Sequence, residues 1–137
     1  MKLIKLKNNM ENKNYLSDEE FQEFLDSIGG LKSGYFTDRI IESRGAFCVG
    51  KGWLGIIKDM ITDLIDLGWD KEFCDCKEKF GGLRFYINGG SDEIFKRISE
   101  AEKLCYTVCE KCGEPGELRT DIGWVLTLCD EHYEKNQ

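Results

Sequence analysis

Cys109-Glu-Lys-Cys112 and, sixteen residues later, Cys129-Asp-Glu-His132 decide how the C-terminal end of this chain folds. Each stretch places two soft metal donors at positions i and i+3, and His132 is the only histidine among the 137 residues. Two such pairs have the spacing that closes a tetrahedron around Zn²⁺. Because four protein ligands leave no coordination position for water or substrate, we expect one structural zinc ion per chain. The alternative is a set of separately buried thiols with a surface histidine.

The residues between the two pairs predict the shape of the unit that holds the metal. Residues 117–119 and 124–128 are typical of two short strands joined across 120–123, and Cys129 begins a terminal helical turn that brings His132 beside it. Cys105 could in principle replace a ligand, but the regular pair at 109 and 112 is the better candidate. The tight turn that carries Cys109 and Cys112, called the knuckle below, is followed by the hairpin and the helical turn. This order predicts a treble-clef-like zinc unit over residues 109–137.

Residues 17–108 predict an α+β core with three helices. Ser17 and Glu20 form a capping box before a helix at 18–28, a second helix is expected at 53–67, and Ser91 caps a third at 92–108. Each has apolar residues at the 3–4 spacing of one helix face. These residues are Phe21, Phe24, Leu25 and Ile28, then Trp53, Ile56, Ile57, Met60, Ile61, Leu64 and Ile65, then Ile94, Phe95, Ile98, Ala101, Leu104, Cys105 and Val108.

A hairpin is predicted between the second and third helices. Residues 73–79 and 83–88 alternate, and Phe80-Gly-Gly82 between them supplies the turn. Cys74 and Cys76 are interpreted as core residues rather than as a redox or second metal pair. The alternation places Cys74, Cys76, Leu83, Phe85 and Ile87 inward, and Asp75, Lys77, Lys79, Arg84, Tyr86 and Asn88 on the other face.

Two segments carry weaker signals. Residues 31–50 have no clear period, so we expect an irregular packed loop with one helical turn near 37–42. Residues 1–16 are expected to be a flexible arm or an edge strand, and Met10 could be an alternative start. Together these observations predict an α+β fold in which about three helices pack on a small antiparallel sheet, with a treble-clef-like zinc unit at the C-terminus.

Composition and charge narrow the range of compartments and partners to expect. The chain has seven cysteines, no evident signal peptide and no apolar run of spanning length, so we expect a cytoplasmic protein that does not contact a membrane. Its formal net charge of -7 disfavours duplex nucleic acid as a partner unless one face is locally basic. A homo-oligomer is left open.

Four motifs carry a resemblance: Gly52-Trp53, Lys77-Glu-Lys-Phe-Gly-Gly-Leu-Arg-Phe-Tyr86, Cys109-x-x-Cys-Gly-x-Pro-Gly-x-Leu-Arg119 and Gly123-Trp-x-x-Thr-Leu-Cys-Asp-Glu-His132. They are similar to a family of small proteins from bacteriophages, prophages and bacteria. The match covers residues 46–134, and Lys51 stands where relatives would have an acidic residue. The resemblance implies the metal quartet and a phage or mobile-element origin, hence the host cell cytoplasm, and it implies no catalytic residue.

The motifs of familiar enzymes are missing from the sequence. A zinc deaminase needs a His-x-Glu motif and an open metal position, and an HNH-type nuclease needs histidines beyond His132. There is no phosphate-binding Walker loop and no Gly-x-Ser-x-Gly nucleophile elbow. An enzyme acting on a nucleotide through carboxylate, Lys and Tyr side chains stays as an alternative.

The remaining candidates are cationic and aromatic side chains suited to binding. One hypothesis is a phage accessory protein that counters host defence by sequestering a small anionic or nucleotide-like ligand, or a host protein. A second is a nucleic-acid-binding zinc module that uses the same face. A third is a solvated sheet face cross-linked by Asp75 and Glu78. The candidate ligand-binding residues are Lys77, Lys79, Arg84, Tyr86, Arg119 and Trp124.

Overall fold

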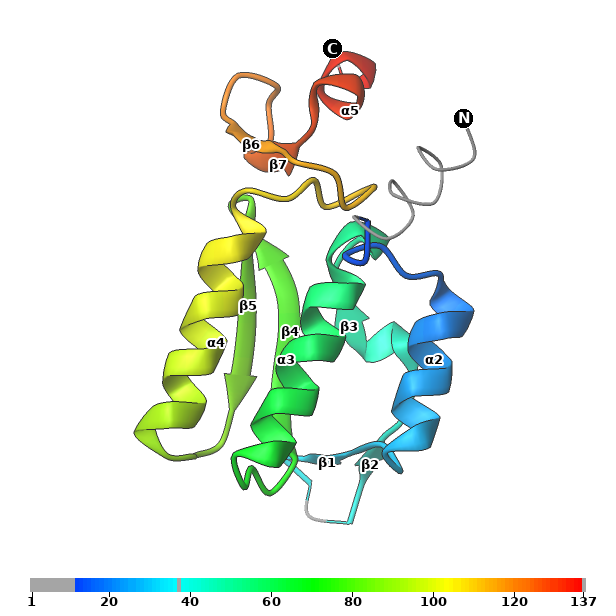
Figure 1. The fold of residues 1–137 in the computed structure, drawn as a ribbon, viewed down its shortest axis with the longest axis vertical. Coiled ribbons are helices and arrows are strands. Elements are labelled where there is room, and N and C mark those ends of the chain that lie inside the picture. Colours follow the sequence, from blue (N-terminus) through cyan, green and yellow to red (C-terminus); the bar gives the residue numbers. More distant parts are fainter. Residues whose placement is uncertain (1–11, 37, 137) are drawn as a thin grey trace.

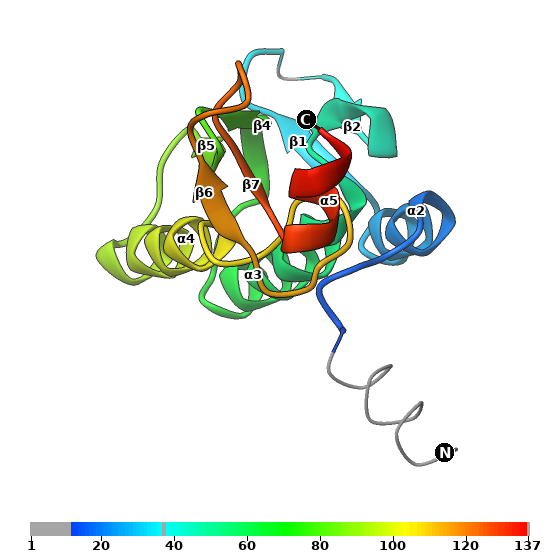
Figure 2. The same cartoon turned by 90° about the horizontal axis from the view of Figure 1, so that it is seen from above.

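The computed structural model describes residues 12–36 and 38–136. Within them, helices α2 (Asp18–Ser27), α3 (Leu54–Asp66) and α4 (Asp92–Cys105) lie side by side on one face of a sheet, and a smaller C-terminal unit sits at one end (Figure 1). Seen along the long axis, the helices form one layer and the strands of the sheet a second (Figure 2). The α+β class expected from the sequence is confirmed.

The three helices begin where the sequence predicts. The Ser17 side chain accepts a hydrogen bond from the Glu20 N–H while the Glu20 carboxylate accepts one from the Ser17 N–H, so the capping box is complete. The Ser91 hydroxyl caps α4 by accepting from the Ile94 N–H. A 3₁₀ turn at Lys51–Trp53 leads into α3, and Gly68, with φ of 96°, follows its end.

The main sheet is mixed, whereas the sequence predicted an antiparallel one. Its strands are β1 (Leu31–Ser33), β2 (Ile40–Ile41), β3 (Phe47–Cys48), β4 (Glu72–Lys79) and β5 (Gly82–Ile87). Within the described residues, β2 pairs with β1, β1 pairs with the beginning of β4 and β3 with its second half, and β5 also pairs with β4. The β1–β2 and β4–β5 pairs are antiparallel, but β1 and β3 both run parallel to β4.

Residues 31–50 are therefore more regular than expected. They contain β1, β2, β3 and a 3₁₀ turn at Arg44–Ala46, in place of an irregular loop with a helical turn near 37–42. Packing in the core explains why this segment is regular. The Phe47 ring stacks on the Phe73 ring of β4 with 5.0 Å between ring centres, and it meets the Phe21 ring of α2 edge-on, also with 5.0 Å between centres. Packing between distant segments, rather than a local pattern, makes Phe47–Cys48 a strand.

The core lies between the helix layer and the sheet. Its side chains are almost all aliphatic or aromatic, and Cys76 is buried among them as expected for a core cysteine. Two residues expected on the apolar stripe of α4, Phe95 and Leu104, are instead about half exposed. The stripe of α4 is narrower than the sequence suggested because only Ile94, Ile98, Ala101 and Cys105 face the core.

The β4–β5 hairpin follows the predicted register except at one position. An irregularity between Phe73 and Asp75 inserts an extra residue in β4, so Phe73 and Cys76 are buried while Cys74 is half-buried and faces Asn88. The prediction that Cys74 points into the core is wrong, because a bulge reverses the alternation of side chains. From Asp75 to Lys79 the alternation holds.

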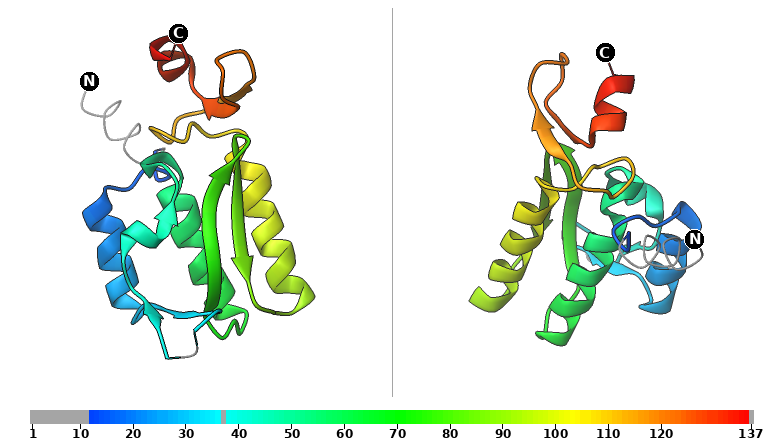
Figure 3. Two further views of the ribbon diagram at one scale, coloured as in Figure 1. Left: turned by 180° about the vertical axis from the view of Figure 1, so that it is seen from behind. Right: turned by 45° about the horizontal axis from the view of Figure 1, so that its top comes forward.

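The face of the sheet opposite the helices is not covered by any described element (Figure 3, left). The C-terminal unit contains β6 (Glu117–Arg119), β7 (Leu126–Leu128) and α5 (Asp130–Lys135). It packs on the tip of the hairpin and on the turn before α3. Residues 12–16, part of the expected flexible arm, lie against the C-terminal unit. The Asn12 side chain donates to the Cys112 carbonyl, and the Asn14 side chain donates to the Gly113 carbonyl. Expectations for residues 1–11 lie outside the described residues.

Candidate metal centre and binding face

The first ligand pair sits on a tight turn. The Gly113 N–H donates to the Cys109 carbonyl at 2.9 Å, and the Cys109 N–H donates to the Glu114 carbonyl at 2.8 Å. Gly113 has a φ of 82°, a left-handed conformation that glycine adopts without cost. The turn folds Cys112 back over Cys109, so that both thiols face the same point.

The second ligand pair is held by a helix start. Cys129 is the N-cap residue of α5, and its sulfur accepts from the His132 N–H at 3.5 Å. Strand β7 leads directly into Cys129, and β6 pairs with β7 in antiparallel register. Knuckle, hairpin and helix thus stand in the predicted treble-clef order.

All four donor atoms converge on one point. The sulfur and nitrogen atoms of Cys109, Cys112, Cys129 and His132 lie within 4.8 Å of one another. The Cys112–Cys129 sulfurs are 3.7 Å apart, and His132 Nδ1 lies 3.6 Å from the Cys109 sulfur and 3.2 Å from the Cys129 sulfur. Zn–S bonds of about 2.3 Å and Zn–N bonds of about 2.0 Å would give tetrahedron edges of roughly 3.5–3.8 Å. The predicted quartet therefore has a geometry compatible with one metal site.

Burial opposes the ionisation of two of the thiols. Burial, together with the neighbouring Cys109 and Cys129 thiols, raises the pKa of the Cys112 thiol to about 12. Burial also opposes ionisation of Cys109, but backbone N–H groups of Cys129 and Cys112 bring the pKa of that thiol below its ordinary value. A metal ion bound at this point would replace the protons of all three thiols.

Glycines let the knuckle approach the core. A Cβ atom on Gly52 would overlap the Cys109 carbonyl oxygen, and the Gly52 N–H donates to the Glu110 carbonyl at 2.7 Å. The Trp53 indole N–H donates to the Val108 carbonyl at 2.8 Å. The Gly52-Trp53 motif is therefore the part of the core on which the knuckle packs.

The tip of the β4–β5 hairpin contacts the C-terminal unit. The Thr127 hydroxyl, fully buried, donates to the Gly81 carbonyl at 2.6 Å. A Cβ on Gly81 would overlap Leu118 of β6, and one on Gly82 would overlap the Tyr106 side chain. The Phe-Gly-Gly motif thus serves a close contact between the sheet and the C-terminal unit.

Three predicted binding residues come together on the uncovered sheet face. Lys77 and Arg84 are cross-strand partners, and Tyr86 follows on the same side of β5. The Lys77 ammonium lies 3.3 Å from Asp75 and 6.0 Å from the centre of the Tyr86 ring. Arg84 lies 3.5 Å from the Tyr106 hydroxyl, which raises the pKa of the guanidinium.

The other three lie away from that cluster. Lys79, at the end of β4, and Trp124 line a shallow hollow of about 290 Å³ together with Phe80. Arg119 is engaged within the C-terminal unit: its guanidinium contacts Asp130 at 2.8 Å and the Leu128 carbonyl at 3.2 Å, and it stacks on Tyr133 at 4.2 Å.

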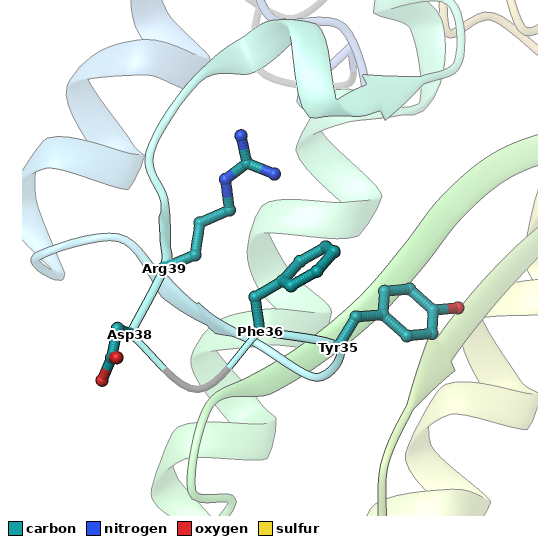
Figure 4. A pocket seen from close by; sticks show the side chains of 4 residues that line it. All are labelled: Tyr35, Phe36, Asp38 and Arg39. Atoms are coloured by element: carbon teal, nitrogen blue, oxygen red, sulfur yellow. The ribbon is translucent and has the colours of Figure 1, made fainter.

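A further surface was missed from the sequence. Tyr35, Phe36, Asp38 and Arg39, in the connection between β1 and β2, line a hollow of about 620 Å³ (Figure 4). Two adjacent aromatic residues close to an arginine, in a segment without a period, were the available signal. Their position depends on the pairing of β1 with β4, and no pattern of neighbouring residues in the sequence predicts that pairing.

Comparison of the chain with models of protein families, with curated proteins and with solved structures gives no match. In the part of the chain that the structure describes, no helix has the length and apolar character needed to cross a membrane. What the chain does must therefore be inferred from its own residues.

Proposed function

We propose that this protein is a non-catalytic binding protein that holds one structural Zn²⁺ and takes up a small anionic ligand on the uncovered face of its sheet. The observation that carries the proposal is the cross-strand pair of Lys77 and Arg84 beside Tyr86, on a face that no described element covers. Two neighbouring cations can bind the oxygens of one phosphate or carboxylate group with charge-assisted hydrogen bonds.

The donor set supports zinc as the metal and a structural role for it. Three thiolates and one imidazole at tetrahedral spacing are typical of Zn²⁺ rather than of the hard cations Mg²⁺ and Ca²⁺. With four protein ligands, the ion has no position for a substrate. Its contribution is to hold β6, β7 and α5 against the hairpin tip.

The proposed biological role and compartment rest on the motif resemblance alone. Because the hairpin and metal motifs resemble proteins of phages and prophages, we propose an accessory protein that acts in the host cell cytoplasm by sequestering its ligand. Sequestration needs affinity but no reactive group, which fits a face made of Lys, Arg and Tyr side chains.

The test is binding of defined anions by calorimetry: tripolyphosphate, ATP and citrate. The double variant Lys77→Ala with Arg84→Ala should weaken the affinity for a bound anion by roughly a hundredfold, since each charge-assisted hydrogen bond contributes about 1.5–3 kcal/mol. Its melting temperature should stay within a few degrees of the wild type, because both side chains are only partly buried, and polar contacts of partly exposed charges, here with Asp75 and Tyr106, add little to stability.

A matched control removes the same charge elsewhere. Lys96 and Lys103 are exposed on α4, on the helix side of the molecule, so Lys96→Ala with Lys103→Ala should leave the affinity unchanged. The proposal fails if none of the three anions binds the wild type, or if both double variants bind alike. Turnover of ATP by the purified protein would contradict a non-catalytic role.

A further inference from the structure

The connection between β1 and β2 is firmly anchored although it carries exposed side chains. The Ser33 hydroxyl accepts from the N–H groups of both Tyr35 and Phe36, at 3.1 and 3.0 Å. The Arg39 N–H donates to the Phe36 carbonyl, and the Ser33 N–H donates to the Arg39 carbonyl. Ser33 itself is buried. The backbone on both sides of the turn is therefore fixed by hydrogen bonds.

This anchored segment presents apolar rings to solvent. Tyr35 is 69% exposed and Phe36 is 62% exposed. The Arg39 guanidinium lies 5.7 Å from the centre of the Phe36 ring, and the ion pairs of the described residues do not include Arg39. Clustered exposed aromatic residues on a rigid support are typical of binding sites, since solvated loops are usually polar.

The segment is continuous with the sheet face described above. The Gly34 N–H donates to the Phe73 carbonyl of β4, and the Gly34 carbonyl accepts from the Asn88 side chain at 3.0 Å. Figure 4 shows the Tyr35, Phe36 and Arg39 side chains extending from this one connection, with the Phe36 ring between the other two. Asn88, which contacts Gly34, follows Arg84 by four residues, so this connection begins roughly 13 Å from Arg84 along the strand at about 3.3 Å per residue.

We propose that Tyr35, Phe36 and Arg39 form the ring-binding half of the ligand site, and that the ligand is a nucleotide with more than one phosphate. The base packs on Tyr35 and Phe36, and the phosphates extend along the sheet to Lys77 and Arg84. Arg39 lies beside the ring and contributes positive charge to the first phosphate. Stacking on aromatic rings accepts any base, so the site selects for a flat ring and a polyphosphate rather than for a sequence. This inference rests on the proposed anion site.

The experiment compares four probes by calorimetry: ATP, AMP, adenosine and inorganic tripolyphosphate. The wild type should bind ATP more tightly than tripolyphosphate, and more tightly than AMP, which is too short to reach both ends. Tyr35→Ala with Phe36→Ala should weaken ATP binding by about tenfold or more through loss of base stacking. The same variant should bind tripolyphosphate as the wild type does, because the cation pair is intact.

Phe95→Ala with Leu104→Ala is the matched control, since it removes two half-exposed apolar side chains from α4 on the helix side. It should bind ATP as the wild type does. If ATP binds no more tightly than tripolyphosphate, the ring-binding half is refuted while the anion site stands. If tripolyphosphate does not bind, the anion site is refuted, and the inference built on it falls as well.

Discussion

The core between the helices and the sheet is held together differently from the C-terminal unit. In the core, large side chains such as Trp53, Ile57 and Leu64 are fully buried against one another. In the described part of the C-terminal unit, residues 109–136, Leu128 is the only fully buried aliphatic side chain. A segment that small cannot bury enough apolar surface to fold by itself. A metal ion held by the quartet would take the place of a hydrophobic core in this unit.

The two regions are nevertheless joined by close backbone contacts. The knuckle rests on Gly52, and the buried Thr127 hydroxyl binds the Gly81 carbonyl at the hairpin tip. Damage to the metal site should therefore spread to the tip of the hairpin but not to α2, which contacts α3 and the turn before β3. Each of the following changes tests this division.

Loss of the metal should have the largest effect. Cys112→Ser should abolish zinc binding and unfold residues 109–136, because structural zinc sites contribute on the order of 10 kcal/mol to folding. Elemental analysis of the wild type purified without chelator should find about one zinc per chain. Limited proteolysis of the variant should cut within 109–136 while α2 and α3 stay protected.

Cys48→Ser is the control for that experiment. Cys48 is an exposed thiol on β3, outside the quartet, so its replacement should leave the zinc content unchanged. A wild-type protein that is fully folded without metal would refute the structural role, and a Cys112→Ser protein that retains one zinc would refute the ligand set.

Crowding where the knuckle packs on the core should have an intermediate effect. The Cβ of Gly52→Ala would overlap the Cys109 carbonyl oxygen and approach the Gly113 nitrogen closely. Overpacking of this kind costs about 1–3 kcal/mol, and backbone atoms cannot move aside as a flexible side chain can. Urea unfolding should show this loss, together with faster release of zinc to a chelator. Gly45→Ala, whose nearest neighbour would be the Ser43 oxygen at 3.4 Å, should show neither change.

The parts of the structure that sequence reasoning predicted depend on local patterns. The capping box at Ser17, the apolar stripe of α3 and the spacing of the metal quartet each lie within a few turns of chain, so their geometry follows from residue order. The quartet needs only that β6 and β7 form a short hairpin. These features were found where they were expected.

The missed parts depend on contacts between distant segments. Lys32 of β1 pairs with Glu72, and Phe47 of β3 pairs with Cys76, and strands of two or three residues are too short for alternation to show. The bulge at Cys74 arises from the register with β5. For the candidate site, Lys77, Arg84 and Tyr86 were predicted as neighbours, whereas the hollow at Tyr35 and Phe36 exists only once β1 is placed.

Relief of backbone strain at Phe80 should have the smallest effect. Phe80 has a φ of 53° at the hairpin tip, where the two regions meet, and its side chain is 66% exposed. A left-handed conformation costs a residue other than glycine about 1–2 kcal/mol, and asparagine tolerates it better. Against this gain, Phe80→Asn loses the contact of the Lys79 ammonium with the ring, at 5.7 Å, which contributes about 0.5–1 kcal/mol at an exposed site.

The strain outweighs that contact, so Phe80→Asn should raise the free energy of unfolding by about 0.5 kcal/mol. Chemical denaturation in the presence of zinc measures the difference, and Tyr86→Asn, an exposed aromatic residue at an ordinary strand position, serves as the comparison and should not stabilise. A loss of stability in Phe80→Asn would mean that the ring packs on Trp124 across the hollow they share more strongly than its exposure suggests. The hairpin tip would then hold the C-terminal unit through side chains as well as through the Thr127 hydrogen bond, and the two regions would be less separable than the metal prediction assumes.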